Sequence, residues 1–595
     1  MILNSLNSLY DRLADDPDYE IAKPGFSPQN ISFHVVIKPN GSLLEVKDAR
    51  LKDTKGKPRS VRQLIMGEAK PSGAGINPCL LWDNMAYMLG YKKDDPKPER
   101  TQQSFEAFRD KHLALEKEIN SSDFSIVCRF LENWSPEQAS EHALEHPEIE
   151  EISTGFGLFS IQGQTKPVNE QEEILQWWDT REIESDAPLS QCLITGESET
   201  PIARLHPKIK SVAGAQSAGA SLVSFNASAY ESYGKDQSFN APVSEKAAFQ
   251  YGTALNALLS GKQSGKHRIR IGDSTCLFWT DKKSLIEETF GIFSTEGSNA
   301  PQKAQDPLLR SKIESFLKLL QIGGEPNDEL DLNPSETNFY LLGLAPNAAR
   351  LSVRFFHRSS VAELLDNLRS HHHDISIVRE WEETKGKRLE DPLYPAYWQL
   401  LSQTARVSDE IPPLLGGSLM RAILQNTPYP EALLSAVIRR IRADRTINYL
   451  RAAIIKGVLT RNHQLNIKTM LDIENTEPAY LLGRLFAALE KTQQDALGDL
   501  NAGLRDKYYS SASATPASVF PRILRTYQHH LSKLSGGGKV VRERLIQDIL
   551  SSIPSSGFPF NFNLKSQGIF ALGYYHQRKD FFTKKETSTE PQSTN

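Results

Sequence analysis

The residues from Leu222 to Pro242, LVSFNASAYESYGKDQSFNAP, gather side chains that can hydrogen-bond, stack and carry charge. Amides and hydroxyls can contact base edges or sugars, tyrosines can stack on a base, and Lys235 adds one positive charge. The same residue types also suit an active site or a polar network that only supports the fold. All three interpretations are open for this segment taken alone.

Motifs for nucleophilic and phosphate chemistry are incomplete. In GAQSAG, Gly214 stands three residues before Ser217, whereas a nucleophile elbow needs a glycine two residues before the serine. GKQSGKH, residues 261–267, is one residue short of a phosphate-binding loop, and His267 stands where a hydroxyl would bind magnesium. The sequence therefore predicts neither serine hydrolysis nor nucleotide hydrolysis.

Three histidines and an acid at positions 371–374, HHHD, are the strongest indication of metal chemistry. Adjacent residues on a helix or strand point in different directions, so such neighbours rarely bind one ion together. We interpret the segment as a solvated polar turn, and we predict no metal, no other cofactor and no catalytic residue. The alternative is a metal-dependent hydrolase acting on nucleic acid through His371, His372, His373 and Asp374.

Cations and small residues precede the polar segment. ARLHPKIKSVAGAQSAGASLVSFN supplies basic side chains and then a run of Gly, Ala and Ser. Small residues let the backbone approach a phosphate chain closely, where its N–H groups donate hydrogen bonds. We expect contacts to the DNA backbone, or stacking on bases, from Lys208, Lys210, Asn226, Tyr233 and Asn240.

Charge is distributed unevenly along the chain. From Arg421 to the end there are 24 Lys and Arg against 14 Asp and Glu, a net charge of +10, whereas residues 1–420 carry −14. Such asymmetry indicates either a polyanion partner for the C-terminal part or two domains that attract each other. A candidate strand-binding strip, in which Arg442 and Arg445 would share a helix face, consists of Arg439, Arg440, Arg442, Arg445, Arg451 and Lys456.

Length and composition indicate a folded protein of several domains. The chain has 595 residues, of which 39% are hydrophobic and 24% charged, which are ordinary globular values. No apolar run is long enough for a membrane-spanning helix, and the N-terminus does not read as a secretory signal. Four cysteines form no CxxC pair, so we expect a cytoplasmic protein in a reducing compartment.

The elements that position these residues change in character along the chain. ISFHVVIKPNGSLLEVKDAR predicts a hairpin turning at Asn40-Gly41, and helical spacing dominates after about residue 410. We predict an α+β protein, a large mixed α/β N-terminal region followed by an all-α bundle of four or five helices. The predicted parts are a mixed domain at 1–150, a mixed α/β core at 151–410, a basic helical bundle at 411–583 and a disordered tail at 584–595.

Several stretches together resemble one family. CLITGESETPIARLHPKIKSVAGAQSAGASLVSFNASAYESYGKDQSFNAP, FYLLGLAPNAARLSVRFF, YPEALLSAVIRRIRADRTINYLRAAIIKG and DKYYSSASATPASVFP are similar to the large subunit of the type I-C CRISPR surveillance complex, Cascade. The resemblance covers essentially the whole chain. It implies a non-catalytic DNA-binding subunit in antiviral defence, acting with a guide RNA that reads the target by base pairing.

The resemblance also implies partners. They are the guide RNA, double-stranded and displaced single-stranded target DNA, the backbone, guide-processing and small subunits, and a helicase-nuclease, with no membrane. The large subunit would read a short motif flanking the target in duplex DNA and promote strand opening. From residue type and placement we expect motif reading by two sets of residues: Lys70, Ser72 and Asn77 in KPSGAGINP, and Lys235 with Gln237.

The C-terminal helices resemble the small subunits of such complexes. In this family the small subunit is made from an internal start within the same gene. Met420 and Met470 are the methionines of the last third, and Met470 precedes a clean helical segment, whereas Met420 sits inside one. We therefore predict a separate short product that starts at Met470.

Overall fold

The computed structural model divides the chain into two compact units. The first comprises Met1–Ser211, Ala215–Gln263 and Ala348–Arg350, and the second comprises Val212–Gly214, Ser264–Asn347 and Leu351–Asn595. The structure describes residues 2–53, 56–67, 70, 75–145, 148–152, 155–181, 187–271, 274–294, 333–379, 381–384, 387–392, 394–407, 410–498 and 503–582. Ser72 and the tail predicted at 584–595 lie outside the described residues.

A five-stranded sheet organises the first unit, and its long strand β1 (Phe26–Ile37) pairs on both sides. One edge of β1 is antiparallel to β2 (Leu43–Asp48) and β5 (Val61–Met66), and the other is parallel to β7 (Phe156–Ile161), which also pairs with β6 (Trp82–Asn84). The β1–β2 turn contains Asn40 and Gly41, where the Asn40 side chain accepts the Ser42 N–H at 3.0 Å. The predicted hairpin is confirmed.

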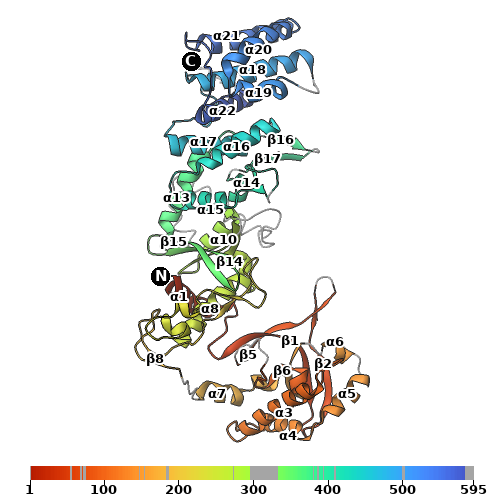
Figure 1. Ribbon diagram of the computed structural model, residues 1–595. Coiled ribbons are helices and arrows are strands. Elements are labelled where there is room, and N and C mark those ends of the chain that lie inside the picture. The colour runs from red at the N-terminus through yellow and green to blue at the C-terminus, as the bar shows by residue number, and fades with distance from the viewer. Residues whose placement is uncertain are drawn as a thin grey trace, which may run out of the picture. The chain divides into compact units, whose positions relative to one another are not determined.

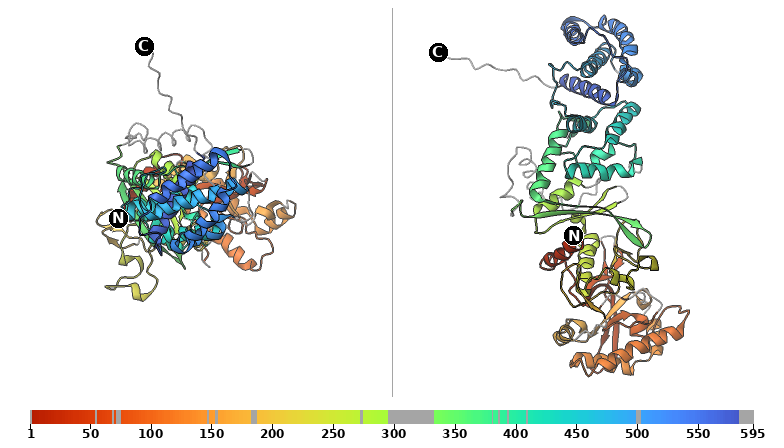
Figure 2. Two further views of the ribbon diagram at one scale, coloured as in Figure 1. Left: turned by 90° about the horizontal axis from the view of Figure 1, so that it is seen from above. Right: turned by 60° about the vertical axis from the view of Figure 1, so that its left-hand side comes forward.

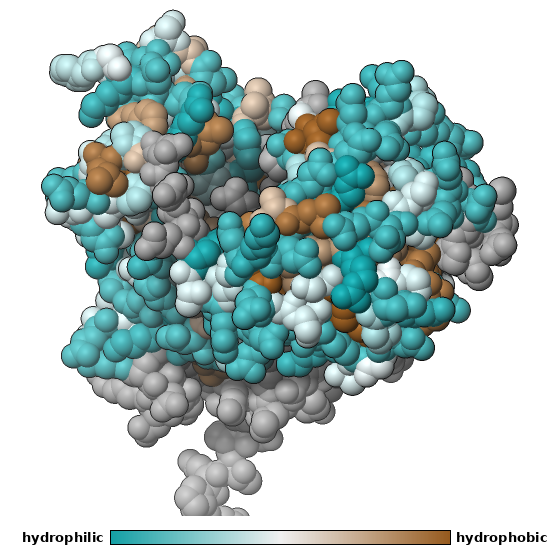
Figure 3. Space-filling view, turned by 90° about the horizontal axis from the view of Figure 1, so that it is seen from below, coloured by the Kyte–Doolittle hydropathy of each residue, from teal (hydrophilic) through white to brown (hydrophobic). Residues whose placement is uncertain are grey.

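Helices pack against this sheet and supply aromatic residues to its core. They are α2 (Met85–Met88), α3 (Pro98–Leu115), α4 (Ser122–Asn133), α5 (Pro136–Glu145), α6 (Glu148–Ile152) and α7 (Glu172–Thr180). Phe105 and Phe108 from α3 and Phe124 from α4 are fully buried with Phe33 and Phe159 of the sheet. The surface in Figure 3 is mainly hydrophilic, with apolar residues in small separate patches.

The rest of the first unit is built on two packed helices, α1 (Ile2–Ala14) and α8 (Glu245–Ser260). Short strands precede α8: β8 (Leu189–Ser190) pairs with β9 (Thr200–Pro201), and β10 (Lys208–Ile209) pairs with β11 (Ala220–Ser221). The polar segment 222–242 runs from β11 to α8 and contains the 3-10 turns η2 (Ser228–Tyr230) and η3 (Gln237–Asn240). A third short pair joins β3 (Leu51–Lys52) to β4 (Pro58–Arg59).

The second unit begins with antiparallel strands and continues as helices. Its strands follow the order β12 (Arg268–Ile271), β13 (Ser274–Thr280), β14 (Asn338–Asn347) and β15 (Arg350–Ser360). A small hairpin joins β16 (Trp381–Thr384) to β17 (Lys387–Glu390). The first helices of this unit are α9 (Ser264–His267), α10 (Leu285–Ser294), α13 (Val361–Ile375) and α14 (Tyr397–Ser402).

The C-terminal part is a helical stack, as predicted, although it has more helices than the four or five expected (Figures 1 and 2). The helices are α15 (Pro413–Leu424), α16 (Glu431–Asp444), α17 (Tyr449–His463), α18 (Pro478–Leu497), α19 (Leu504–Ala512), α20 (Pro516–Leu531), α21 (Gly536–Ser551) and α22 (Leu564–Asp580). Helix α18 contacts α19, α20, α21 and α22. The sheet-containing N-terminal region and these helices confirm the α+β class.

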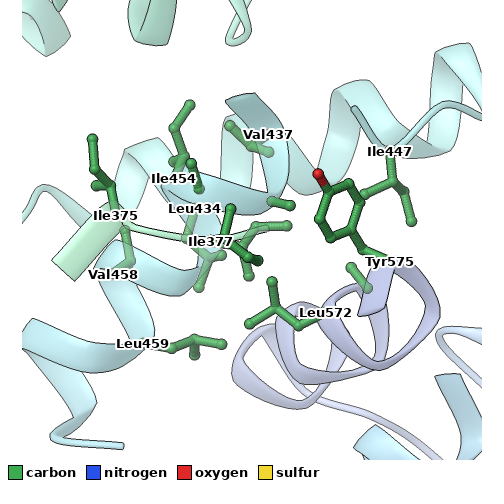
Figure 4. Close-up of a cluster of buried hydrophobic side chains, with 14 of the residues drawn as sticks. Ile375, Ile377, Leu434, Val437, Ile447, Ile454, Val458, Leu459, Leu572 and Tyr575 are labelled. Carbon is green, nitrogen blue, oxygen red and sulfur yellow. The ribbon is translucent and has the colours of Figure 1, made fainter. Parts of the chain in front are cut away.

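Helix α22 joins two layers of this stack. On one side it crosses α18 at glycines, since a Cβ added to Gly573 would lie 2.2 Å from the carbonyl oxygen of Tyr480. On the other side it packs on α16 and α17, and Figure 4 shows Leu572 and Tyr575 of α22 among apolar side chains of those helices. Burying this surface ties α22, the last helix among the described residues, to residues that precede Met470.

Candidate nucleic-acid interface

The polar segment carries a tight turn at its centre. Ser232 and Lys235 form an isolated antiparallel bridge, and the Lys235 N–H donates to the Ser232 carbonyl at 3.0 Å. Both central residues have positive φ angles, 56° at Tyr233 and 67° at Gly234, as in turns that join twisted strands. The Tyr233 side chain is 99% exposed at the tip.

Asn240 holds this turn in shape. Its side-chain oxygen accepts the Ser232 N–H at 2.8 Å, and its amide nitrogen donates to the carbonyls of Lys235 at 2.7 Å and Gln237 at 3.0 Å. The side chain therefore satisfies backbone groups on both arms of the turn. These bonds give Asn240 a positioning role within the segment.

Lys235 and Gln237, the second predicted motif-reading set, differ in their surroundings. Lys235 is exposed, and its ammonium group has no hydrogen-bond or ion-pair partner among the described residues. Gln237 is half-buried with a φ angle of 46°, and its side-chain oxygen accepts from the Arg204 guanidinium at 3.0 Å. Tyr233 and Lys235 thus point into solvent at the turn, whereas Gln237 is hydrogen-bonded to Arg204 within the protein.

Arg350, a residue that the sequence did not single out, supports the start of the segment. Its guanidinium donates to the Asn226 side chain and lies over the Tyr230 ring, 4.5 Å from the ring centroid. Ser221 of β11 also pairs with Arg350 across the strands. Because Arg350 is more than a hundred residues away in sequence, only the fold brings these groups together.

Lys208 begins the short strand β10 and Lys210 follows directly after it, and both are exposed. The Lys208 ammonium donates to the Ser221 hydroxyl at 2.9 Å. Asn256 of α8 fixes the strand's backbone, since it donates to the Lys208 carbonyl at 3.1 Å and accepts the Lys210 N–H at 2.8 Å. The two lysines are therefore anchored through their backbone and have exposed side chains.

A second candidate surface lies in the N-terminal domain, where Lys70 and Asn77 line a cavity of about 470 Å³. The Lys70 ammonium forms an ion pair with the fully buried Asp83 carboxylate and lies 3.3 Å from the centroid of the Tyr87 ring. Burial raises the pKa of Asp83, whereas the neighbouring Lys70 charge lowers it. The charge of Lys70 is thus largely compensated inside the protein.

Asn77 is placed differently in the same cavity. Its backbone N–H donates to the Tyr87 hydroxyl at 3.2 Å, and its exposed side-chain amide makes no hydrogen bond within the described residues. Cations surround it, because the residues lining this cavity include Lys92, Lys93, Lys97 and Arg100 and one carboxylate, Asp95. We call this the basic cavity; it combines a free amide with positive charge.

The six cations predicted as a strip on the helical bundle do not form one. Arg445 is the left-handed residue that ends α16, with a φ angle of 56°, so the expectation that it shares a helix face with Arg442 is wrong. Arg442 donates to Gln567 at 2.8 Å, and Arg440 pairs with Asp444 at 2.5 Å. Of the six, Arg439 and Arg445 are exposed.

The two remaining cations of that set are buried. Arg451 is 7% exposed and pairs with Asp444. Lys456 is 3% exposed, and its ammonium donates to the carbonyls of His373 at 3.2 Å and Asp374 at 2.9 Å. Burial lowers the pKa of Lys456. These side chains join helices to one another and are not accessible to a nucleic acid.

An exposed basic face does occur elsewhere, on α20. Arg522, Arg525 and His529 are spaced by three and four residues, and Lys533 follows just beyond the helix end. All four are exposed, and no carboxylate pairs with them among the described residues. Arg522 also lies 5.9 Å from the centroid of the Tyr508 ring. This spacing can be recognised in the sequence, although arginines are denser on α16.

The interpretation of HHHD as a solvated polar turn is wrong. These residues end helix α13, and His371 is 1% exposed with Nδ1 2.7 Å from the Tyr429 hydroxyl. Asp374 accepts from the Arg461 guanidinium at 2.6 Å, while His373 is exposed. The helix thus turns the four side chains toward different partners. No cluster of three or more His, Cys, Asp and Glu suited to a metal ion occurs among the described residues.

Met470 lies in the connection between α17 and α18 and is 57% exposed. Met420 lies within α15 and is 1% exposed. A chain beginning at Met470 would therefore start outside a helix and contain α18 to α22 complete. In the described part of the structure, no helix is long and apolar enough to cross a membrane.

Comparison with known protein families gives a match over nearly the whole chain. Residues 6–582 match the model of a family described as CRISPR-associated protein (Cas_Csd1). No curated protein matches the chain. The family match spans nearly the whole sequence, including the polar segment, the basic cavity and the helical stack. The chain belongs to the CRISPR-associated Cas_Csd1 family, the large subunits of the type I-C Cascade complex.

Proposed function

We propose that this Cascade subunit reads a short motif in duplex DNA beside the guide-matched target and promotes opening of the strands. The observation that carries the proposal is the turn at Ser232–Lys235, which presents an aromatic ring and a free ammonium on a backbone held by Asn240. A side chain that stacks on bases and a neighbouring cation are what a wedge in duplex DNA requires.

The magnitudes favour such a wedge. Opening a duplex loses about 1.4 kcal/mol of stacking per base step, and stacking of one base on an aromatic side chain recovers about 1–3 kcal/mol. Tyr233 can therefore offset about one base step. Lys235 would add a phosphate contact on the same turn, and the hydrogen-bonded backbone reduces the entropy lost on binding.

The basic cavity is the proposed site of motif reading in the N-terminal domain. The free Asn77 amide suits hydrogen bonding to a base edge, and Lys92, Lys97 and Arg100 suit the flanking phosphates. Lys70 takes a positioning role here, because its ammonium is bound to Asp83 and to the Tyr87 ring.

The helical stack would hold the displaced single strand, and the exposed face of α20 is the proposed contact.

We further propose that the C-terminal part is also made as a separate small subunit from Met470. The whole chain acts without catalysis beside the guide RNA, the backbone and guide-processing subunits and a helicase-nuclease. A cytoplasmic location suits its four free cysteines.

The test is to reconstitute the RNA-guided complex with and without this chain. Affinity is measured for duplexes that all match the guide but differ in the flanking base pairs. We expect affinity to depend on the flank when the chain is present and to become independent of the flank when it is omitted. Equal affinities for all flanks with the chain present would contradict the proposal and would leave a purely structural role.

A further inference from the structure

A second cavity in the N-terminal domain, of about 480 Å³, lies beside the basic cavity. Lys70 and Asn77 line both cavities, so these two residues form a shared wall. The second cavity is bounded by Trp177 and Trp178 near the end of α7, by Lys111 of α3 and by Arg181, and we call it the tryptophan cavity. Its volume lies within the range of small-molecule sites.

The tryptophan cavity contains cations that lack an acidic partner. Lys111 donates to the Pro78 carbonyl at 2.8 Å, and the Arg181 guanidinium lies over the Trp178 ring. Neither forms an ion pair with a carboxylate among the described residues, and Glu118 is the one acid among the described lining residues. Burial lowers the pKa of both Lys111 and Arg181. Cations without counter-ions favour an anionic ligand.

The aromatic wall of this cavity is fixed in orientation. The Trp178 indole N–H donates to the Gly25 carbonyl at 3.2 Å, and the Trp177 and Trp178 rings are 6.2 Å apart. Both indoles are half-buried and pack against the core of the domain. A rigid aromatic surface offers stacking without the entropy cost of ordering a flexible side chain.

One ligand class uses both parts of the cavity. An inorganic anion would use the cations and leave the indoles unused, and an apolar ligand would leave the cations uncompensated. A nucleotide has a flat base for the indoles and a phosphate for Lys111 and Arg181. Because the wall of the cavity is also the wall of the basic cavity, such a nucleotide could belong to a strand bound there.

We propose that the tryptophan cavity binds one unpaired nucleotide of the DNA strand whose duplex part lies in the basic cavity. This inference rests on the proposed function, in which the chain opens duplex DNA beside the motif. Holding an extruded nucleotide in a site of its own would keep the first opened position from pairing again, and the contacts of the site would offset the unstacking that extrusion requires.

The direct test uses the full chain alone and follows its tryptophan fluorescence during titration with thymidine 5′-monophosphate. We expect saturable quenching and an affinity that falls about tenfold in Lys111→Gln/Arg181→Gln and in Trp177→Leu. The matched control Lys52→Gln/Lys57→Gln changes two exposed lysines that line neither cavity and should bind the nucleotide as the unaltered chain does. Circular dichroism verifies that each variant is folded.

Two further probes determine the ligand class. Inorganic phosphate and a phosphoserine peptide should each bind at least tenfold more weakly than the nucleotide, because neither can stack a base. The proposal is overturned if either binds as tightly as the nucleotide, or if the Lys111/Arg181 and Trp177 variants keep full nucleotide affinity.

The reconstituted complex separates this inference from the proposed function. Loss of flank dependence in the unaltered complex would contradict motif reading, whereas nucleotide binding by the isolated chain would still support the cavity. Conversely, Lys111→Gln/Arg181→Gln should weaken binding to every fully paired duplex by the same factor. The ratio of the affinities for two duplexes that differ in their flanking base pairs should therefore not change. Unchanged binding to those duplexes would overturn a role of the cavity in strand opening.

Discussion

The turn at Ser232–Lys235 and the helices α16–α17 are both rich in residues that could contact DNA, yet the structure uses them in opposite ways. In the turn, one internal side chain, Asn240, satisfies the backbone, so Tyr233 and Lys235 face solvent. In the helices, Arg440, Arg451 and Lys456 are bonded to carboxylates and carbonyls of the protein. Cationic residue type is thus a weak guide to binding until the partners of each side chain are known.

The helices also show what an abundance of arginine does for a fold. Asp444 accepts from both Arg440 and Arg451, and Asp374 accepts from Arg461 while its carbonyl accepts from Lys456. These bonds connect the end of α13 to α17 and the end of α16 to the start of α17. Removing these hydrogen bonds should therefore lower the stability of the fold more than it lowers the affinity for DNA.

The largest expected effect concerns the start at Met470, which separates helices α16 and α17 from helices α18 to α22. Met470→Leu, encoded by CTC, should abolish the short product because it removes the internal start codon, and the full-length chain should remain. The measurement is an immunoblot of expressed protein with an antibody against the C-terminal helices. Met420→Leu is the matched control and should leave the short band in place; persistence of the band in Met470→Leu would refute the internal start.

Lys456→Met should destabilise the second unit by about 3 kcal/mol, since it leaves two buried carbonyls without their charged donor. The urea midpoint of the full chain, followed by circular dichroism in the helical band, reports this loss. Arg439→Met is the control, because Arg439 is exposed on the same pair of helices, and it should change stability by less than about 0.5 kcal/mol. Equal midpoints for the two variants would mean that the internal bonds of α17 contribute little.

Much of this fold could be predicted because its signals are local. Asn40-Gly41 between two apolar runs predicts a hairpin, and the apolar spacing after residue 410 predicts helices, since a few neighbouring residues determine each of them. The contacts within the candidate sites could not be predicted in this way. Arg350 beneath Tyr230 and the pairing of Lys70 with Asp83 each depend on contacts that the fold creates between distant residues.

The HHHD segment illustrates the same difference. Its composition suits a polar turn, but the preceding residues VAELLDNLRS continue a helix whose buried face includes Leu364, Leu368 and His371. The partner of His371 is Tyr429, 58 residues away. Burial next to a distant hydroxyl leaves no pattern in the sequence, whereas the exposed spacing of Arg522, Arg525 and His529 on α20 does leave one.

Tyr233→Ala should lower the affinity of the reconstituted complex for fully paired targets by about tenfold, because one aromatic stack is lost. Targets with mismatched base pairs at the opening position should lose less affinity, since they need no wedge there. Gel-shift titrations of both targets give the loss of affinity for each, and the ratio of the two losses is compared. Tyr230→Ala is a control, because Tyr230 lies under Arg350 and away from the tip of the turn. Equal losses for paired and mismatched targets would argue against a wedge.

Asn240→Ala should reproduce part of that loss, about fivefold, through the shape of the turn and not through a DNA contact. If Asn240 acts by positioning Tyr233, the double variant Tyr233→Ala/Asn240→Ala should bind no worse than Tyr233→Ala alone, because effects on one unit are not additive. A double-mutant cycle on fully paired targets measures this coupling. Additive losses would instead indicate that Asn240 contacts DNA itself.

The smallest effect separates the two helical surfaces. Arg522→Gln/Arg525→Gln should lower the slope of log affinity against log salt by about 1.4 for a single strand of mixed sequence, since each phosphate contact contributes about 0.7. Arg440→Gln/Arg442→Gln removes the same charge from groups already bonded to Asp444 and Gln567, so it should leave that slope unchanged. A lower slope in the second pair alone would reverse the assignment and place the strand on α16. Because both pairs remove two charges from the same helical stack, any difference between their slopes reports accessibility and not net charge.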